Sequence, residues 1–431
     1  MIQAPRKTLL ASATTCALIA AAPALAGGLT LYEVGTADVG LASAGYGARA
    51  QDASTVLTNP AGMTRLDGSQ LLLGVQALYG KMDFSLGAGT SPQLGLESGG
   101  NPIGWFPGGG AFYTYSLSPD VKLGFALTGN FGLSVKYDDG WAGRYYLQKA
   151  TLLGISLLPS IAWKATDKLS LGASLNVMYG IMKNTVAVNN IFGNPDGQLT
   201  LDNNTWGVGA NLGLLYEFTP GTRVGLVYNS QVKLDFSPQA QFTGLAPLLG
   251  AVLNARGLPG ATVDLGVTVP QGVMLSGFHQ VDDKLALLAS AGWQQWSKFG
   301  KVDVGIESNN PVGFTTSLDF KDTWHLALGG QYKVSQPWTL NFGVAYDSGF
   351  QDSSNVSPAL PANAAWRFGV GAQNQVDKSF SWGVSAAYIY GGSLDVNKQA
   401  TVPYLLGGRG NLVGTYDPRM LFLAANVSWK F

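Results

Sequence analysis

Cysteine is almost absent from the chain, with one residue, Cys16, among 431. A disulfide framework therefore cannot account for its stability. Charge is scarce as well, because only 12% of the residues are charged and the 26 acidic and 26 basic side chains balance. That balance excludes the electrostatic footprint of a nucleic-acid-binding protein. No run of eighteen apolar residues occurs beyond the N-terminus, which argues against a helical membrane protein.

The first residues have the pattern of a secretion signal. Two basic residues precede an alanine-rich apolar stretch, and the small residues Ala24 and Ala26 stand where signal peptidase requires them. We therefore predict a signal peptide over residues 1–26 and a mature chain that begins at Gly27. An N-terminal anchor helix is the alternative, but the apolar run is short and small residues follow it.

From Ser69 onward, apolar residues recur at every second position. In the segment "TWGVGANLGLLYEF", one face holds apolar and aromatic side chains, whereas glycine, Asn211 and Glu217 occupy the other. Alternation of this kind is typical of a β-strand with one apolar side. It recurs in "LSLGASLNVMY", "TWHLALGGQY", "TLNFGVAYD" and the closing "LFLAANVSWKF".

The connections between these strands are alternately short and long. The short ones are turns at 118–120, 166–168, 219–221, 282–284, 335–337 and 376–378. The long ones lie near 81–109, 136–150, 183–203, 237–262, 300–320, 348–363 and 392–418. These thirteen connections predict fourteen strands.

A water-soluble sandwich would also show alternation, but it does not explain the two kinds of connection or the Trp and Tyr residues near the ends of the apolar faces. A transmembrane barrel needs both, since backbone groups in lipid must pair around a closed sheet and outer-membrane barrels have short periplasmic turns and long external loops. We therefore predict an all-β fold, a 14-stranded antiparallel transmembrane β-barrel over residues 69–431, in the bacterial outer membrane. The terminal Phe431 resembles the signal that such barrels present to their assembly machinery.

Residues 27–68 precede the barrel on its periplasmic side. Their alanine, glycine and serine content would suit a disordered tail, which is one interpretation. Against it, Asp52 and Ser54 are helix-capping residue types, and Asn59-Pro60 starts a turn. A folded segment at a barrel mouth can close it, so we predict a small N-terminal helical plug (hatch) in the lumen.

The segment "YEVGTADVGLASAGYGARAQDASTVLTNPAGM" resembles the hatch of the FadL family, the outer-membrane transporters of long-chain fatty acids and related hydrophobic compounds. The Asn-Pro-Ala motif of the family corresponds to Asn59, Pro60 and Ala61. The similarity continues through "GNFGL", "NSQVKLDF", "LSGFHQVDDKLAL", "WSKF" and "FKDTWHLALG", so it covers nearly everything after the signal peptide. It implies a channel whose hatch moves when a ligand occupies an apolar pocket.

The resemblance also implies a kink in the third strand that opens a hole in the barrel wall. The corresponding residues are Asn130, Phe131 and Gly132, where the apolar alternation of residues 121–135 is interrupted. Glycine inside a strand marks a bulge or a bend. A strand that simply ends in its loop is the alternative. A hydrophobic molecule could pass sideways through such a hole into lipid. Each of its methylene groups that stays out of water lowers the free energy by roughly 0.8 kcal/mol.

The connection 237–262 carries apolar residues at helical spacing that would suit an external groove for the ligand. They are Leu245, Leu248, Leu249, Val252 and Leu253. A helix packed on the barrel rim is an equally good interpretation.

The family pattern breaks at the head group of the ligand. Fatty-acid transporters of the family place an arginine at the outer end of the fifth strand, where this chain has Val186. A buried carboxylate needs a cation or several N–H donors. Lys183 and Lys321 are the candidates, although each could instead be a solvated rim lysine. The missing arginine raises the alternative of an uncharged aromatic or aliphatic hydrocarbon as ligand.

Catalysis and open diffusion are the competing functions. An outer-membrane enzyme needs a nucleophile or base, commonly a histidine. The two histidines are expected far apart, His279 near a periplasmic turn and His325 near the outer end of the tenth strand. No G-x-S-x-G motif occurs, so we predict no enzyme, no cofactor and no metal ion. A general porin would lack the plug. We expect a monomer that contacts outer-membrane lipid, lipopolysaccharide and a hydrophobic ligand, and no nucleic acid.

Overall fold

The computed structural model describes residue 32 and residues 34–431, apart from 191–193, 355 and 363. The predicted signal peptide over residues 1–26 and the predicted first mature residue, Gly27, lie outside the described residues. Among the described residues, no helix is long and apolar enough to cross a membrane.

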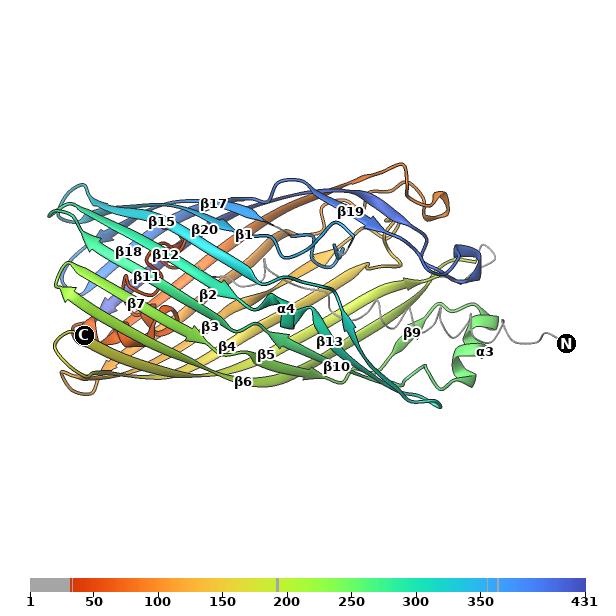
Figure 1. Cartoon of the computed structure of the whole chain (residues 1–431), viewed down its shortest axis with the longest axis horizontal. Helices are drawn as coiled ribbons and strands as arrows, with labels where there is room; N and C mark the ends of the chain where they lie inside the picture. The colour runs from red at the N-terminus through yellow and green to blue at the C-terminus, as the bar shows by residue number, and fades with distance from the viewer. Residues whose placement is uncertain (1–31, 33, 191–193, 355, 363) are drawn as a thin grey trace.

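Fourteen antiparallel strands of the described chain close into a barrel (Figure 1), which confirms the predicted fold class. Each strand pairs with the next one in the ring, and the last strand pairs with the first along its whole length. In ring order the strands are β1 (Gln70–Leu86), β2 (Gly104–Ser116), β3 (Val121–Lys136), β4 (Lys149–Lys164), β5 (Leu169–Val188), β6 (Gly197–Thr219), β7 (Thr222–Asn229), β11 (Gly272–Gln280), β12 (Leu285–Gln294), β15 (Thr323–Lys333), β16 (Trp338–Asp347), β17 (Ala365–Gln375), β18 (Phe380–Tyr390) and β20 (Leu412–Lys430).

Two belts of aromatic side chains ring the barrel. Near the short turns, the neighbouring rings are Tyr216–Phe218, Trp338–Trp382 and Phe380–Trp429, with centroids 4.9 to 5.6 Å apart. Toward the long connections they are Tyr79–Trp105, Tyr179–Trp206 and Tyr346–Trp366, with centroids 4.8 to 5.1 Å apart. Tyr and Trp concentrate at both interfaces of a bilayer, so the strands cross the membrane between these belts. The end with the short turns then faces the periplasm.

On one side of the barrel, four strands continue toward the extracellular end as a separate outer sheet. Its strand order is β14-β13-β10-β8. The bounds are β8 (Val232–Phe236), β10 (Thr262–Val269), β13 (Lys301–Glu307) and β14 (Val312–Ser317). The short helix α4 (Trp296–Phe299) separates β12 from β13. The apolar face of this sheet, which includes Leu234, Leu265 and Val304, is buried in the barrel interior.

The strands extend farther into the predicted long connections than the sequence suggested. The connection 300–320 forms the hairpin of β13 and β14, and the connection 183–203 holds the end of β5 and the start of β6. Beyond the bilayer a strand needs no apolar outward face, so its alternation is weaker and its end is hard to predict. The remaining elements are β9 (Gln241–Thr243), β19 (Leu394–Lys398), η1 (Ala37–Val39), α2 (Thr55–Thr58), η2 (Pro60–Arg65), η3 (Pro92–Leu94), α3 (Pro247–Ala255) and η4 (Tyr404–Leu406).

Residues 34–68 fold inside the barrel, in its periplasmic half, as a plug built from η1, α2 and η2 (Figure 1). Inward-facing glycines of the wall leave room for the backbone of the plug. A Cβ on Gly225 would meet the carbonyl oxygen of Gly47, and one on Gly343 would meet that of Leu41. The glycines on the polar face of the strands therefore let the plug lie directly against the wall.

Candidate functional site

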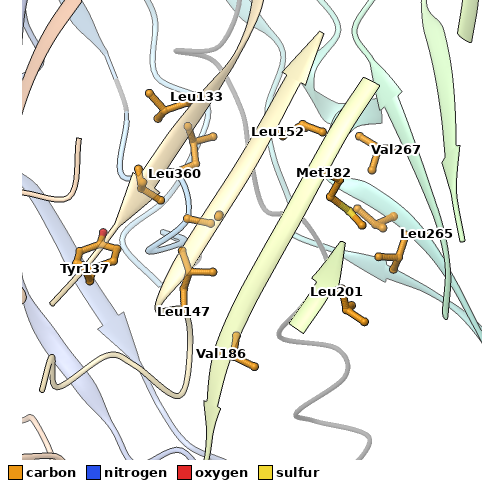
Figure 2. Close-up of a cluster of buried hydrophobic side chains, with 14 of the residues drawn as sticks. Leu133, Tyr137, Leu147, Leu152, Met182, Val186, Leu201, Leu265, Val267 and Leu360 are labelled. Carbon is orange, nitrogen blue, oxygen red and sulfur yellow. The ribbon is translucent and has the colours of Figure 1, made fainter. Parts of the chain in front are cut away.

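Beyond the plug lies a large set of buried apolar side chains, here called the outer apolar cluster. Figure 2 shows part of it, with residues from barrel strands, the outer sheet and the connections. The labelled residues are Leu133, Tyr137, Leu147, Leu152, Met182, Val186, Leu201, Leu265, Val267 and Leu360. Val186, which the sequence resemblance aligns with an arginine of the family, is 1% exposed within this cluster. At that position a ligand would therefore meet hydrocarbon.

The barrel wall has an unpaired stretch between β2 and β3, here called the window. The two strands pair with each other only as far as Gly110 and Thr128. Farther out, β2 pairs with β1 and β3 pairs with β4. At the top of the window, Lys136 donates its backbone N–H to the carbonyl oxygen of Pro102 at 2.7 Å. Between these limits, the described residues form no backbone ladder between β2 and β3.

The predicted kink residues lie on the β3 side of the window. The register between β3 and β4 shifts between Gly129 and Phe131, so Asn130 has no partner residue in this ladder. After the shift Phe131 is buried in the outer apolar cluster, with its ring 6.1 Å from that of Phe299. Gly132 has a φ of 127°, a conformation that favours glycine. The window therefore lies beside the apolar interior.

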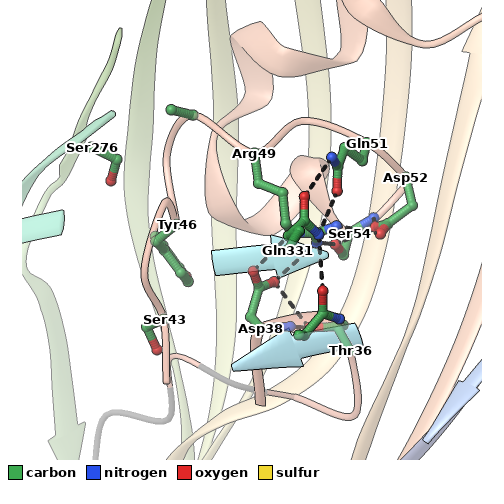
Figure 3. A network of polar contacts seen from close by, with 12 residues as sticks. Thr36, Asp38, Ser43, Tyr46, Arg49, Gln51, Asp52, Ser54, Ser276 and Gln331 are labelled. Atoms are coloured by element: carbon green, nitrogen blue, oxygen red, sulfur yellow. Dashed lines mark hydrogen bonds and ion pairs between the residues drawn. The ribbon is translucent and has the colours of Figure 1, made fainter. Parts of the chain in front are cut away.

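A buried ion network joins the turns of the plug to one another (Figure 3). Arg49 donates to Asp38 at 3.0 Å, to Asp52 at 2.6 Å and to Ser54 at 2.9 Å. Burial alone would lower the pKa of Arg49, but the two carboxylates raise it above its ordinary value. Burial would likewise raise the pKa of Asp52, but Arg49 lowers it. Both charges are therefore kept inside the plug.

Arg223 of β7 connects the wall to the centre of the plug. Its guanidinium donates to the carbonyl oxygens of Ala48 and Arg49, both at 2.6 Å. The same group stacks on Phe278, 3.7 Å from the ring centroid. Arg223 is 3% exposed, so these contacts are shielded from solvent.

The Asn-Pro-Ala motif forms a second connection between the plug and the wall. Asn59 donates to the carbonyl oxygens of Gly47 at 2.6 Å and Leu214 of β6 at 3.1 Å. Its side-chain oxygen accepts the backbone N–H of Ala61 at 3.1 Å, and Pro60 begins η2. The motif thus shapes its own turn and fastens that turn to β6.

A second group of charges, here called the luminal charged cluster, lies on the inward faces of β15, β16 and β17. His325 Nδ1 lies 2.7 Å from one carboxylate oxygen of Asp347, and Arg367 Nε donates to the other at 2.5 Å. The ring of Tyr32, from the start of the described plug, lies 4.6 Å from the ring of His325. His325 is 2% exposed, and its Nε2 has no hydrogen-bond partner among the described residues.

A cavity of about 50 Å³ connects the two clusters. Tyr32, Asp347 and Arg367 line its polar side, whereas Phe350 and Phe422 line its apolar side. Phe350 belongs to the outer apolar cluster, so the cavity touches both hydrocarbon and charge. An amphiphilic ligand needs both, an apolar surface for its tail and charged groups for its head.

Sequence reasoning missed the luminal charged cluster. One signal was present, because Arg367 stands between Trp366 and Phe368, whose side chains are exposed to lipid, and alternation then turns Arg367 inward. A charge in a membrane-spanning segment commonly marks a functional site. The sequence alone does not show that His325 pairs with a carboxylate in the lumen.

Neither lysine predicted for the head group faces the lumen. Lys183 pairs with Asp202 at 2.7 Å, and Lys321 pairs with Asp352 at 2.7 Å. The side chains of Lys183 and Lys321 are 42% and 61% exposed. The alternation that buries Met182 in the interior turns Lys183 to the outside of the barrel.

The predicted groove residues lie on and beside helix α3, at the extracellular end (Figure 1). Leu253 is buried, and Leu245 and Leu249 pack against the outer apolar cluster. Leu248 remains exposed, and Val252 is half-buried. One side of the helix therefore covers the barrel rim while another faces solvent.

These features define a class of protein, an outer-membrane barrel that is closed by an internal plug and has an apolar lumen. The family model described as "Outer membrane protein transport protein (OMPP1/FadL/TodX)" matches residues 17–431. The chain belongs to this family. It is therefore an outer-membrane transporter of hydrophobic compounds and not an enzyme.

Individual relatives agree with this assignment. The long-chain fatty acid transport protein of Escherichia coli (strain K12) is 27% identical, in an alignment that covers 95% of this chain and 98% of that protein. The crystal structure of a Pseudomonas aeruginosa FadL homologue superimposes with a TM-score of 0.82 at 20% identity, covering 94% and 99% of the two chains. The P. putida toluene transporter TodX gives a TM-score of 0.64 at 17% identity, covering 91% and 99%. These two solved structures support the fold.

Proposed function

We propose that this protein carries long-chain fatty acids inward across the outer membrane. One observation carries the proposal: a single cavity borders both the luminal charged cluster and the outer apolar cluster. A fatty acid has a charged head and a long alkyl tail, so it matches both sides of this cavity. The printed name of the Escherichia coli relative, a long-chain fatty acid transport protein, supports the same cargo.

Arg367 is assigned to the carboxylate in place of Lys183 and Lys321. Burying a carboxylate without a partner is costly, so the binding residue must itself lie in the lumen. Arg367 is 6% exposed and borders the cavity, whereas the two lysines are exposed and pair with carboxylates outside the lumen. Asp347 fixes the guanidinium, which is therefore held in place before the ligand arrives.

The tail is assigned to the outer apolar cluster and the exit to the window. Phe131 belongs to that cluster and stands at the edge of the unpaired wall. An alkyl chain that leaves through the window passes directly into lipid. Exposing each methylene group to water costs roughly 0.8 kcal/mol of free energy, so this route is more favourable than one through a water-filled pore. The exposed Leu248 of α3 offers a first contact outside the barrel.

The plug senses the ligand through Tyr32, which lines the cavity. A ligand shifts the plug only if it binds two arrangements of the plug with different affinities. Asn59 ties the centre of the plug to β6, and Gly35 donates its backbone N–H to Gln76 of β1 at 3.0 Å. The proposed movement therefore lies at Tyr32, which borders the cavity, and the Asn-Pro-Ala motif stays fixed.

Uncharged hydrocarbons are the second candidate cargo. Val186 favours them, because the position where fatty-acid transporters of the family have an arginine here presents an alkyl group to the interior. A hydrocarbon would need the outer apolar cluster and the window but not the luminal charged cluster. Binding of a fatty acid should therefore depend on Arg367, whereas binding of a hydrocarbon should not.

Calorimetry of the purified barrel with oleate and with toluene separates the candidates. For a fatty-acid transporter, Arg367→Leu should weaken oleate binding about tenfold or more, a loss of roughly 1.4 kcal/mol, and leave toluene binding unchanged. The double variant Arg367→Leu with Asp347→Leu should show the same loss without an unpaired buried carboxylate. Lys183→Leu is the control and should change neither ligand. Tighter binding of toluene than oleate, with no effect of Arg367→Leu, would instead establish the hydrocarbon function.

A further inference from the structure

We infer that His325 distinguishes a carboxylic acid from other hydrophobic molecules by holding the carboxyl group of the ligand together with one proton. The inference rests on the proposed function, because it concerns the same cavity. It adds the residue that selects the ligand and the protonation state in which the ligand is bound.

Asp347 fixes the orientation and tautomer of His325. The two residues are direct cross-strand partners in β15 and β16, with Nδ1 2.7 Å from the carboxylate oxygen. A carboxylate can only accept a hydrogen bond, so Nδ1 carries the proton between them. A neutral imidazole held in this way presents Nε2 as an acceptor. In the described structure this Nε2 is buried and has no partner.

An unpaired buried acceptor is costly, and a donor from the ligand would satisfy it. A hydrocarbon has no donor to offer. A protonated carboxyl group has one, its O–H, together with a carbonyl oxygen that Arg367 can bind. His325 lies behind the cavity wall, against two residues that line the cavity: Asp347, its hydrogen-bond partner, and Tyr32, whose ring is 4.6 Å from its own. The proposal therefore requires the head group to pass Tyr32 to meet Nε2.

The charges around His325 determine how many protons the site holds. The ionisable groups that face it are Asp347, Arg367 and Tyr32. The side chains opposite it on β12 are uncharged, since Gly292 is its register partner and Ser290 and Gln294 flank that position. Asp347 and Arg367 cancel, so a bare carboxylate would bring a net negative charge into a buried site. A carboxylate that arrives with one proton keeps the site neutral.

The proton comes from the buffer. A fatty acid is a carboxylate in neutral water, because an ordinary carboxyl group has a pKa near 4. Binding therefore joins one carboxylate, one proton and one neutral imidazole. The product is either an acid whose O–H donates to Nε2 or a carboxylate beside an imidazolium, and both have the same atoms and the same net charge.

The lining of the cavity agrees with this assignment. On its polar side Tyr32, Asp347 and Arg367 offer contacts to a carboxyl group. Phe350 leads from the cavity into the outer apolar cluster, which takes the tail. The head group and the tail of the ligand are therefore bound by different parts of the site.

Proton uptake can be counted by calorimetry of oleate binding in buffers with different ionisation enthalpies. The wild-type barrel should take up about one proton per oleate bound, and His325→Phe about none. His279→Phe is the matched control, because His279 is the other histidine and lies exposed on β11, 2.8 Å from Thr222. It should keep the wild-type proton uptake.

Methyl oleate separates the head group from the tail. The wild-type barrel should bind oleate about tenfold more tightly than methyl oleate, and His325→Phe should bind the two equally. His325→Gln is the second variant in case His325→Phe does not fold. Its amide can donate to a bare carboxylate but cannot take up a proton, so oleate should bind without proton uptake and more weakly, because its charge is then uncompensated.

Two results would overturn the role of His325. One is wild-type binding of oleate without proton uptake, and the other is unchanged uptake in both His325 variants. Failure of the proposed function looks different, because then the wild-type barrel binds toluene more tightly than oleate and Arg367→Leu changes neither affinity.

Discussion

Gly132 of β3 lies so close to Leu152 of β4 that a Cβ on Gly132 would meet the carbonyl oxygen of Leu152. A side chain there would therefore clash with the wall instead of filling the window. Gly132→Val adds strain to a φ of 127° and should lower the stability of the barrel by roughly 1–3 kcal/mol. Thermal unfolding in detergent measures the loss. Gly129→Ala is the control, since a Cβ there meets nothing within 4 Å, and an equal loss in both variants would contradict the clash.

Closing the window requires a link between its two edges. Pro107→Cys in β2, at an exposed position, and Asn130→Cys in β3 place thiols on opposite sides of the unpaired wall, and the predicted mature chain has no other cysteine. If ligand leaves sideways, a short thiol cross-linker should stop oleate uptake into proteoliposomes and leave oleate binding intact. A cross-linker with a reducible bond should restore uptake when a reductant is added.

The matched control for this link is a pair that already lies in register. Tyr113→Cys and Phe125→Cys stand opposite each other where β2 and β3 pair, so their cross-link should leave uptake unchanged. Uptake that continues at the wild-type rate with the window linked would exclude the lateral route.

The barrel was predictable because its two faces meet different surroundings. Lipid on one side and the plug on the other impose a period of two on every strand, and turn chemistry marks the periplasmic ends. The outer sheet was not predictable in the same way. Strands β8 and β10 keep an alternating pattern outside the wall, so the sequence does not show where the barrel ends and the separate sheet begins.

The luminal charged cluster was harder to predict because it depends on register. His325 and Asp347 become partners only through the pairing of β15 with β16, and Arg367 reaches Asp347 from the next strand. In the sequence each of these residues is a single polar residue on the inward face of its strand, and nothing shows that the three meet. Lys183 misses the lumen for a related reason, since neighbouring residues of a strand point to opposite faces and Met182 takes the inward one. Lys321 lies in the connection between β14 and β15, where it pairs with Asp352.

Lys398 of β19 provides a prediction about pH at the extracellular end. Burial, followed by the nearby Arg409, lowers the pKa of Lys398 to about 8. The fold therefore disfavours the charged amine, and this cost is present below pH 8 and disappears as the pH rises toward the ordinary lysine value. Lys398 should react with amine-acylating reagents at pH 8 well before the exposed Lys81, as measured by peptide mass spectrometry. Equal reaction of the two lysines would show that the amine is not perturbed.

Arg223 joins the wall directly to the plug, because its one guanidinium donates to the carbonyl oxygens of both Ala48 and Arg49. Arg223→Met removes the donors and leaves two buried carbonyl groups without partners, at a cost of roughly 1–3 kcal/mol for each. The strands of the wall pair with one another independently of this contact. We therefore expect a barrel that still forms but whose plug is loose, and swelling of liposomes in small sugars should be faster than with the wild-type protein.

Two further variants decide whether the loose plug follows from the lost hydrogen bonds. Arg223→Lys keeps a charge and a donor but cannot reach two carbonyl groups with a planar fork, so it should give an intermediate swelling rate. Arg419→Met removes an exposed arginine from β20 and should leave the rate unchanged. If Arg223→Met swells no faster than the wild-type protein, the remaining contacts hold the plug: the hydrogen bond of Asn59 to Leu214 and the fit against wall glycines such as Gly225 and Gly343. The guanidinium then only satisfies backbone groups that these contacts have already placed.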